Sequence, residues 1–200
     1  MKNLFKAFTI LAACACLSFA QPENNDPKVI VIDVAHGGKD HGATFNGFTE
    51  KEIAAQVAAK IKALNQGTDV TIHFTRDDDE FVTLEDRVKA INALNPDFVL
   101  SLHVNFAKTD EPYGMEFFIS DAVDKNKKAS VYAAMLADKF EDYDTEIKQA
   151  KFYLLKNIKA PTIVFELGYL SNEIDRRYLT NEKSQEAIAA SVFQFIKEIE

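Results

Sequence analysis

The sequence of 200 residues has two cysteines, no tryptophan and no long hydrophobic run. Cys14 and Cys16 both lie within the first 20 residues, so the rest of the chain offers neither disulfides nor thiolate metal ligands. No apolar stretch reaches the roughly 20 residues that a membrane-spanning helix requires. We therefore expect a protein that does not span a membrane and whose fold does not depend on disulfides.

Basic residues are outnumbered, because 31 acidic residues against 23 basic ones give a net charge of −8. Proteins that bind nucleic acid neutralise its phosphates largely with lysine and arginine. An acidic chain is therefore not expected to bind nucleic acid, or any other anionic polymer, by charge alone.

The first 20 residues have the pattern of a secretory signal peptide. Lys2 and Lys6 flank an apolar run at 7–17, and Ser18-Phe19-Ala20 follows as a small-x-small cleavage motif. A second pattern, Leu11-Ala12-Ala13-Cys14, is typical of lipoproteins anchored at the cysteine, but cleavage there would leave a very short apolar core. We expect export to the periplasm or cell envelope, with a lipid anchor at Cys14 as the alternative.

Beyond the leader, the chain predicts one domain. Residues 21–28 are polar and include two prolines, which indicates a flexible lead-in. The single domain then covers 29–200, where short runs of β-branched and aromatic residues alternate with helical patterns. The alternation predicts an α/β fold, a three-layer sandwich with a mostly parallel central sheet and helices on both faces. We expect strands at 29–34, 70–74, 98–104, 115–119 and 162–166, and helices at 50–64, 84–94, 129–140 and 182–199.

Residues that can bind metal follow three of the predicted strands. His36 follows the first, His103 ends the third and Glu166 ends the last, so they should meet where ligands bind, beyond the carboxyl ends of parallel strands. Glu50 is the first residue of the next helix, and this helix should begin near the same edge. Catalytic zinc is typically bound by three protein ligands, here two imidazoles and one carboxylate, with the fourth position left for water. The second carboxylate is then free to act as a base.

These residues lie in motifs that resemble the type 3 family of zinc-dependent N-acetylmuramoyl-L-alanine amidases. The motifs occur in the family's order across nearly the whole chain after the leader: Ile32-Asp33, His36-Gly37-Gly38-Lys39-Asp40, Gly42-Ala43, Gly47, Glu50-Lys51, Thr75-Arg76-Asp77, Leu84 with Arg87, Ser101-Leu102-His103-Val104-Asn105, and Glu166-Leu167-Gly168-Tyr169-Leu170-Ser171-Asn172. The resemblance implies a fold like that of zinc amidases and carboxypeptidases. Carried over by position, it implies one zinc ion per chain, bound by His36, Glu50 and His103, with Glu166 as the catalytic carboxylate.

The resemblance also implies a substrate, peptidoglycan. The reaction would hydrolyse the amide bond between N-acetylmuramic acid and L-alanine and release stem peptides. Two other functions stay open at this point: a zinc peptidase or carboxypeptidase with the same four groups, and an inactive wall-binding regulatory module. The connections that follow His103 and Ile119 are too short for an inserted helix over the cleft, so we expect activity without an activator.

Two positions depart from the family's pattern. Val34-Ala35 stands where Pro-Gly is usual before the first histidine, and His41 stands where a proline is usual. Glycine eases a tight turn, so the geometry of this loop is uncertain from sequence, and no pattern assigns a role to His41. Arg87 is expected to form a structural ion pair, and the acidic run at 77–80 is expected to be a solvated turn, because it lacks the spacing of a calcium loop.

Overall fold

The computed structural model describes residues 28–199, without the side chains of 123–126. The expected signal peptide at 1–20 and nearly all of the lead-in lie outside the described residues. None of the described helices is long and apolar enough to cross a membrane. The elements are β1 (Val29–Val34), β2 (Thr44–Phe45), β3 (Phe48–Thr49), α1 (Glu50–Leu64), β4 (Thr71–Phe74), α2 (Leu84–Leu94), β5 (Phe98–Asn105), β6 (Met115–Ser120), α3 (Val123–Ala137), the 3-10 helix η1 (Asp138–Phe140), β7 (Thr145–Ala150), α4 (Tyr153–Asn157), β8 (Thr162–Tyr169), α5 (Glu173–Leu179) and α6 (Glu182–Glu198).

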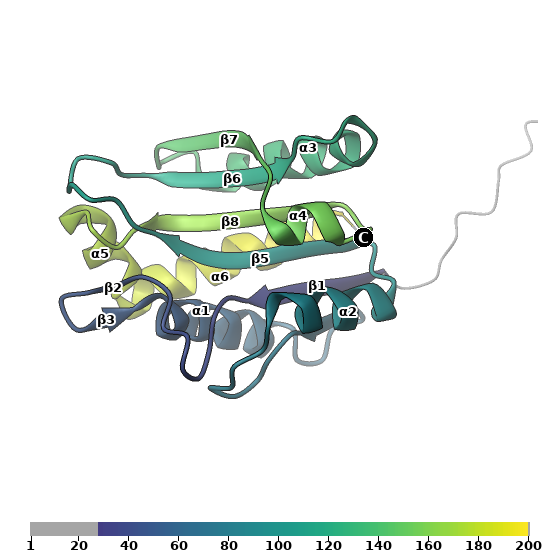
Figure 1. Cartoon of the computed structure of the whole chain (residues 1–200), viewed down its shortest axis with the longest axis horizontal. Helices are drawn as coiled ribbons and strands as arrows, with labels where there is room; N and C mark the ends of the chain where they lie inside the picture. The colour runs from purple at the N-terminus through teal and green to yellow at the C-terminus, as the bar shows by residue number, and fades with distance from the viewer. Residues whose placement is uncertain (1–27, 200) are drawn as a thin grey trace, which may run out of the picture.

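Six strands form one sheet in the order β4-β1-β5-β8-β6-β7 (Figure 1). Strands β4, β1, β5 and β8 run parallel to one another. Strand β6 runs antiparallel to β8, and β7 pairs with β6 in parallel. The carboxyl ends of β1, β5 and β8 therefore meet at one edge of the sheet, and those of β6 and β7 lie at the other. The mostly parallel α/β sheet is confirmed.

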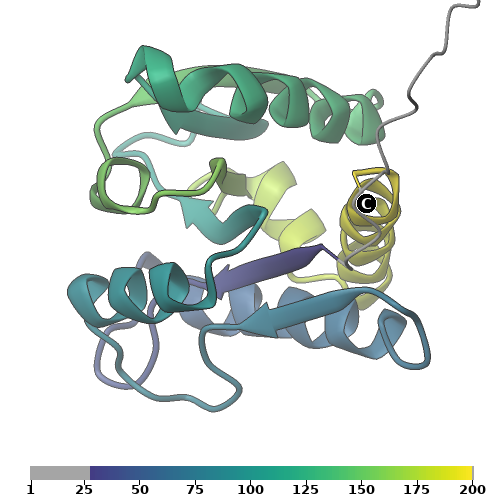
Figure 2. The same cartoon turned by 90° about the vertical axis from the view of Figure 1, so that its right-hand side faces the viewer.

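Helices cover the two faces of the sheet unequally. On one face, α1, α3 and α6 enclose a large core that includes Leu100, Phe117 and Phe165. On the other, α2 and α4 pack over a smaller cluster of Val31, Ile91, Val99, Leu154 and Ile158. Figure 1 shows these two short helices in front of the lower strands, and Figure 2 shows them on the opposite side of the sheet from α6. At the start of α4, Phe152 also contacts Phe118 of β6 on this face, and β7 forms the edge of the sheet beyond β6.

Side-chain caps fix where the two helices nearest the site begin. The Thr49 hydroxyl accepts a hydrogen bond from the backbone of Glu52 at the start of α1, and Thr83 does the same for Asp86 at the start of α2. Both helices have the bounds that the apolar spacing predicts. Because α1 begins directly after β3, Glu50 is fixed at the first position of a well-anchored helix.

Several elements were not predicted. Strand β7 is an edge strand with alternating polar residues, so it lacks the apolar signature of a buried strand. Helices α4 and α5 have five and seven residues, too few to show a helical period. Helix α3 begins six residues earlier than the predicted 129, and its apolar residue Val131 is 58% exposed. Its buried face consists instead of Ala129, Tyr132, Ala133 and Leu136.

Candidate metal centre

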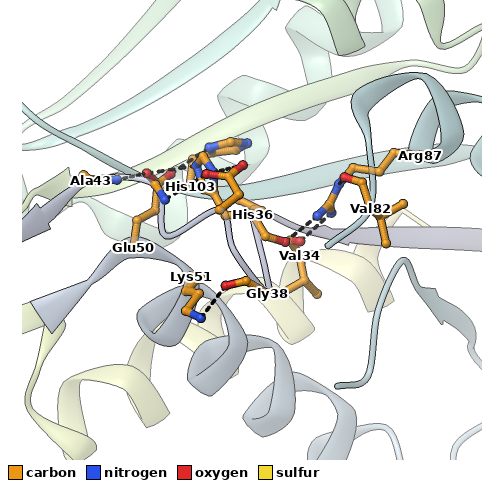
Figure 3. Close-up of polar contacts among 12 residues, drawn as sticks. Val34, His36, Gly38, Ala43, Glu50, Lys51, Val82, Arg87 and His103 are labelled. Carbon is orange, nitrogen blue, oxygen red and sulfur yellow. Dashed lines mark hydrogen bonds and ion pairs between the residues drawn. The ribbon is translucent and has the colours of Figure 1, made fainter. Parts of the chain in front are cut away.

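Three residues with metal-binding side chains converge beyond β1 and β5. His36 lies in the loop after β1, Glu50 opens α1 and His103 lies in β5. One potential ligand atom from each lies within 4.8 Å of the other two. The imidazole rings of His36 and His103 meet edge to face, with their centroids 5.3 Å apart (Figure 3). The structure thus brings together the three residues predicted from the sequence to be metal ligands.

Glu50 lies between the two histidines, and both of its oxygens are held in place. Its Oε2 lies 3.0 Å from His36 Nε2 and accepts a hydrogen bond of 2.8 Å from the backbone of Ala43. Its Oε1 lies 2.8 Å from His103 Nδ1 and accepts one of 3.0 Å from the backbone of Val104 (Figure 3). The side chain is only 6% exposed, so the carboxylate is fixed before any ligand binds.

A second carboxylate lies behind His36, at ion-pair distance but without the angles of a hydrogen bond. Asp40 Oδ2 lies 2.9 Å from His36 Nδ1, and Asp40 Oδ1 accepts a hydrogen bond from the backbone of Gly42. Metal-binding histidines characteristically have their other ring nitrogen held by a carboxylate or carbonyl, which fixes the tautomer and the ring orientation. Asp40 was recognised only as part of a motif, because its role depends on the fold of the loop.

The departure from Pro-Gly at Val34-Ala35 does not disturb this loop. The left-handed backbone begins one residue later, with φ angles of 56° at His36, 128° at Gly37 and 56° at Gly38. Ala35 is buried and its φ is not positive. The conformation that favours glycine is therefore not required where the family's glycine is missing.

Arg87 also holds the loop that carries His36. Its guanidinium forms a buried ion pair of 2.9 Å with Asp33 and donates to the carbonyls of Val34 and His36 (Figure 3). The expected structural ion pair of Arg87 is present. The acidic run is mostly solvated, but Asp79 accepts from Lys51 Nζ at 2.7 Å and from the backbone of Gly38 at 2.8 Å, so it also anchors the loop.

The pKa values of the three converging side chains are shifted by their mutual contacts. Burial alone would lower the pKa of His103, but Glu50 and the charge of Glu166 outweigh it and raise the pKa to about 9. Burial likewise opposes the raised pKa of His36, and Glu50 again outweighs it. The two imidazoles in turn overcome the burial of Glu50 and hold its pKa below the ordinary value. Lone pairs aimed at one point repel unless a proton or a cation lies between them, and a divalent cation fits this donor set.

Glu166 lies beside this group without taking part in it. It is the direct cross-strand partner of His103, and its Oε2 is buried with no hydrogen-bond partner among the described residues. Burial, reinforced by the charges of Glu50 and Glu116, raises the pKa of Glu166 to about 7, although His103 opposes this. Such a carboxylate is able to accept and return a proton near neutral pH.

A pocket of about 270 Å³ opens onto His103 and Glu166. Its other walls are apolar and come from Leu84 of α2, from Val164 of β8, and from Phe152, Tyr153 and Leu154 at the start of α4. The residues around α4 were missed from the sequence because this helix is too short to leave a period. His41 is exposed, and its backbone carbonyl accepts a hydrogen bond from the backbone of Lys51.

Comparison with known sequences identifies similar proteins across almost the whole described chain. The profile of a family described as N-acetylmuramoyl-L-alanine amidase matches residues 30–198. The uncharacterized protein YqiI of Bacillus subtilis is 31% identical, over 96% of this chain and 95% of its own length. The N-acetylmuramoyl-L-alanine amidase LytC of the same organism is 27% identical over 82% of this chain, but the match covers only 34% of LytC.

Solved structures agree. The catalytic domain of CwlV, an N-acetylmuramoyl-L-alanine amidase from Bacillus (Paenibacillus) polymyxa, is 27% identical with a TM-score of 0.79, over 86% of this chain and 97% of that domain. The CwlD amidase of Clostridioides difficile, solved in complex with the GerS lipoprotein, is 26% identical with a TM-score of 0.77, over 86% of this chain and 97% of CwlD.

Proposed function

The chain belongs to the family of type 3 N-acetylmuramoyl-L-alanine amidases, and from this premise we propose that His36, Glu50 and His103 bind one catalytic zinc ion while Glu166 transfers the proton. The enzymes of this family are hydrolases, and the bond cleaved is the amide between N-acetylmuramic acid and L-alanine in peptidoglycan. The family is typically zinc-dependent. The assignment of ligands and base to residues of this chain is our proposal.

One observation carries the proposal: three ligand atoms lie within 4.8 Å of one another, directly beside a buried carboxylate oxygen that has no partner among the described residues. Three protein ligands that include two imidazoles leave a coordination position for water, as in catalytic zinc sites. Bound zinc supplies Lewis-acid activation of the attacking water and of the scissile carbonyl. The chain itself supplies the position of these ligands and a base of suitable pKa.

The base is Glu166. With a pKa near 7 it is partly ionised at neutral pH, so it accepts a proton from the attacking water and returns it to the nitrogen of the departing L-alanine. Its unpartnered Oε2 is available for this transfer. The His36 loop needs no movement for catalysis, because Asp40, Arg87 and Asp79 hold it in place.

We also propose that the protein acts in the periplasm or cell envelope. The features that support export are the pattern at residues 1–20 and a substrate that lies outside the cytoplasmic membrane. Cleavage after Ala20 and lipid attachment at Cys14 remain the two forms to distinguish. The intact mass of the protein recovered from the envelope separates them.

Mass spectrometry of peptidoglycan digested by the purified protein tests the reaction. Release of intact stem peptides with L-alanine at the new amino terminus supports amidase activity. Loss of a terminal D-alanine instead would identify a carboxypeptidase, and an unchanged digest with full zinc occupancy would identify an inactive binding module. Dialysis against a chelator should abolish turnover and zinc should restore it, with metal analysis giving one zinc per chain.

A further inference from the structure

A row of acidic side chains leads from the metal centre across the sheet. His103 of β5 pairs with Glu166 of β8, Glu166 pairs with Glu116 of β6, and Glu116 pairs with Glu146 of β7. Direct cross-strand partners project from the same face of a sheet. The row therefore lies on the face of the sheet that carries α2 and α4, beside the contact between α4 and Phe118 of β6.

Glu116 is the centre of this row and is already saturated with hydrogen bonds. Its Oε1 accepts from Lys148 Nζ at 2.6 Å and from the Tyr169 hydroxyl at 2.7 Å, and its Oε2 accepts from Asn105 Nδ2 at 3.0 Å. Glu116 is buried, whereas all three donor residues are partly exposed. A substrate cation would have to displace one of these donors to reach it. Glu116 instead fixes the positions of these three donor groups.

Lys148 carries the positive charge of the cluster. Its ammonium has three protons, and the two carboxylates bonded to it, Glu116 and Glu146 at 2.8 Å, account for two of them. The hydrogen bonds that Lys148 donates to Glu116 and Glu146 raise the pKa of Lys148, so it stays charged. Glu146 is 64% exposed, and such a surface ion pair contributes little, so a better-placed carboxylate from a ligand is able to displace Glu146.

The position of Lys148 matches one group of the substrate. Neighbouring strands lie about 4.8 Å apart, so an ammonium bound to Glu116 on β6 lies roughly 5 to 10 Å from Glu166 on β8. A peptide extends about 3.5 Å per residue, so the second residue of the stem peptide lies about 7 Å from the scissile bond. That residue is D-glutamate linked through its γ-carboxyl group. It carries a free α-carboxylate or, where the wall is amidated, a neutral amide.

We propose that Lys148, positioned by Glu116, binds the free α-carboxylate of the second stem-peptide residue and makes the enzyme select non-amidated peptidoglycan. Lys148 is then a specificity-determining residue, and Glu116 is a positioning residue. Asn105 and Tyr169 donate hydrogen bonds to the same Glu116 carboxylate and so help to fix it. This inference rests on the proposed amidase function, because it places the peptide on the β6 side of Glu166.

A matched pair of substrates tests the inference. The zinc-loaded protein is given N-acetylmuramoyl-L-alanyl-D-isoglutamate and its α-amide, the isoglutamine form, and kcat and KM are measured for both. We expect kcat/KM to be about tenfold higher for the free acid, which corresponds to about 1.4 kcal/mol. Lys148→Met should remove this preference by raising KM for the acid alone, whereas Lys148→Arg should retain it. Lys151→Met is the control, because Lys151 is 74% exposed and pairs only with Asp121 in the described part of the chain, so the preference should survive there.

Glu146→Gln should not reduce turnover of the acid, unlike Lys148→Met. It removes the carboxylate that competes for Lys148, so turnover of the acid should rise or stay unchanged. A fall would show that the acidic row binds a substrate ammonium and would overturn the inference. Equal use of both substrates by the unaltered protein, or an equal loss on both with Lys148→Met, would overturn it as well.

Calorimetric titration separates this inference from the proposed function. The zinc-loaded protein is titrated with the two possible products, L-alanyl-D-isoglutamate and L-alanyl-D-isoglutamine. Tighter binding of the acid supports the role of Lys148 even if neither muramyl substrate is cleaved, a result that would count against the amidase mechanism alone. Equal binding of the two dipeptides overturns the role of Lys148 whatever the activity.

Discussion

His103 and Glu166 are direct partners in the parallel register of β5 and β8. Both side chains therefore project from the same face of the sheet, although they are far apart in sequence. His103 faces Glu50 through its Nδ1, whereas the Oε2 of Glu166 has no partner among the residues described. A candidate metal ligand and a candidate base are thus held at a spacing set by the sheet, which makes their proposed roles separable by mutation.

The first prediction concerns Glu166→Gln. The amide fills the same volume but cannot accept a proton, so kcat should fall roughly 10²–10⁴-fold. Zinc content and thermal stability should stay unchanged, because no hydrogen bond joins Glu166 to the other three side chains in the described part of the chain. Zinc stoichiometry and kinetics on one preparation provide the measurement. Near-normal turnover with full zinc would show that another group is the base.

The second prediction concerns pH. Burial raises the pKa of Glu166 to about 7 in the metal-free site, and the positive charge of bound zinc would oppose this rise, so kcat/KM should increase about tenfold per pH unit at acidic pH and level off by about pH 7. An unperturbed glutamate would place the plateau near pH 5 instead. The profile is measured with saturating zinc. The residual activity of Glu166→Gln serves as the control, since its profile should lack this ionisation.

The third prediction uses two glycines. Gly42 has a φ of 64°, and a Cβ there would lie 2.6 Å from His36 Cδ2 and closer still to Glu50 Oε2. Gly47 has a φ of 81° with no atom within 4 Å of its Cβ position. Both alanine substitutions incur the left-handed backbone cost of about 1–2 kcal/mol. Only Gly42→Ala should also lose zinc and activity.

Equilibrium unfolding and metal analysis of the two variants provide the comparison. Similar losses of stability with zinc retained only in Gly47→Ala would support the proposed ligand set. Full zinc binding and normal turnover in Gly42→Ala would mean that the ligand atoms do not need the positions found here.

The fourth prediction concerns the buried pair of Arg87 and Asp33. Arg87→Met leaves an uncompensated buried carboxylate, so the free energy of unfolding should fall by about 3–5 kcal/mol. The pKa of Asp33 is lowered by Arg87 and its hydrogen bonds against the effect of burial, so its ionised form stabilises the fold above pH about 4, and this contribution is lost as the pH falls. Urea unfolding at pH 7 and pH 3 measures both effects. Lys62→Met, which breaks an exposed pair with Asp77, should change stability by less than about 1 kcal/mol.

The sequence was sufficient to predict that His36, Glu50 and His103 would converge, because they stand next to strongly patterned elements. An apolar strand ends just before His36, another carries His103 near its carboxyl end, and a capped helix begins at Glu50, so their convergence follows from parallel topology. The order of the strands in the sheet could not be predicted from the sequence. Nothing in the local pattern of residues 115–119 shows that β6 runs antiparallel to β8.

Groups that depend on irregular or edge structure were not predictable. Lys148 lies on an edge strand without an apolar period, and its contact with Glu116 exists only because β7 pairs with β6 in one register. Phe152 and Tyr153 reach the pocket from a helix of five residues. Asp40 comes within ion-pair distance of His36 through a loop whose left-handed residues include His36 itself.

The last prediction is that the enzyme needs no activator, and it depends on where α3 lies. A blocking element would have to pack over His103 and Glu166. The chain between β5 and β6 is instead a loop without a helix, at residues 106–114. Helix α3 packs against β6, β7 and α6 through Ala129, Tyr132 and Leu136, on the face opposite the metal centre.

Purified residues 21–200, loaded with zinc and mixed with isolated peptidoglycan, should therefore release stem peptides without a second protein. Mass spectrometry of the soluble products measures this, and the Glu166→Gln variant is the control for contaminating hydrolases. Two results would contradict the prediction: digestion that appears only after an envelope partner is added, or only after residues between Asp121 and Asp144 are deleted. Because Ala129, Tyr132 and Leu136 belong to the large core, that deletion should instead destabilise the fold and abolish activity.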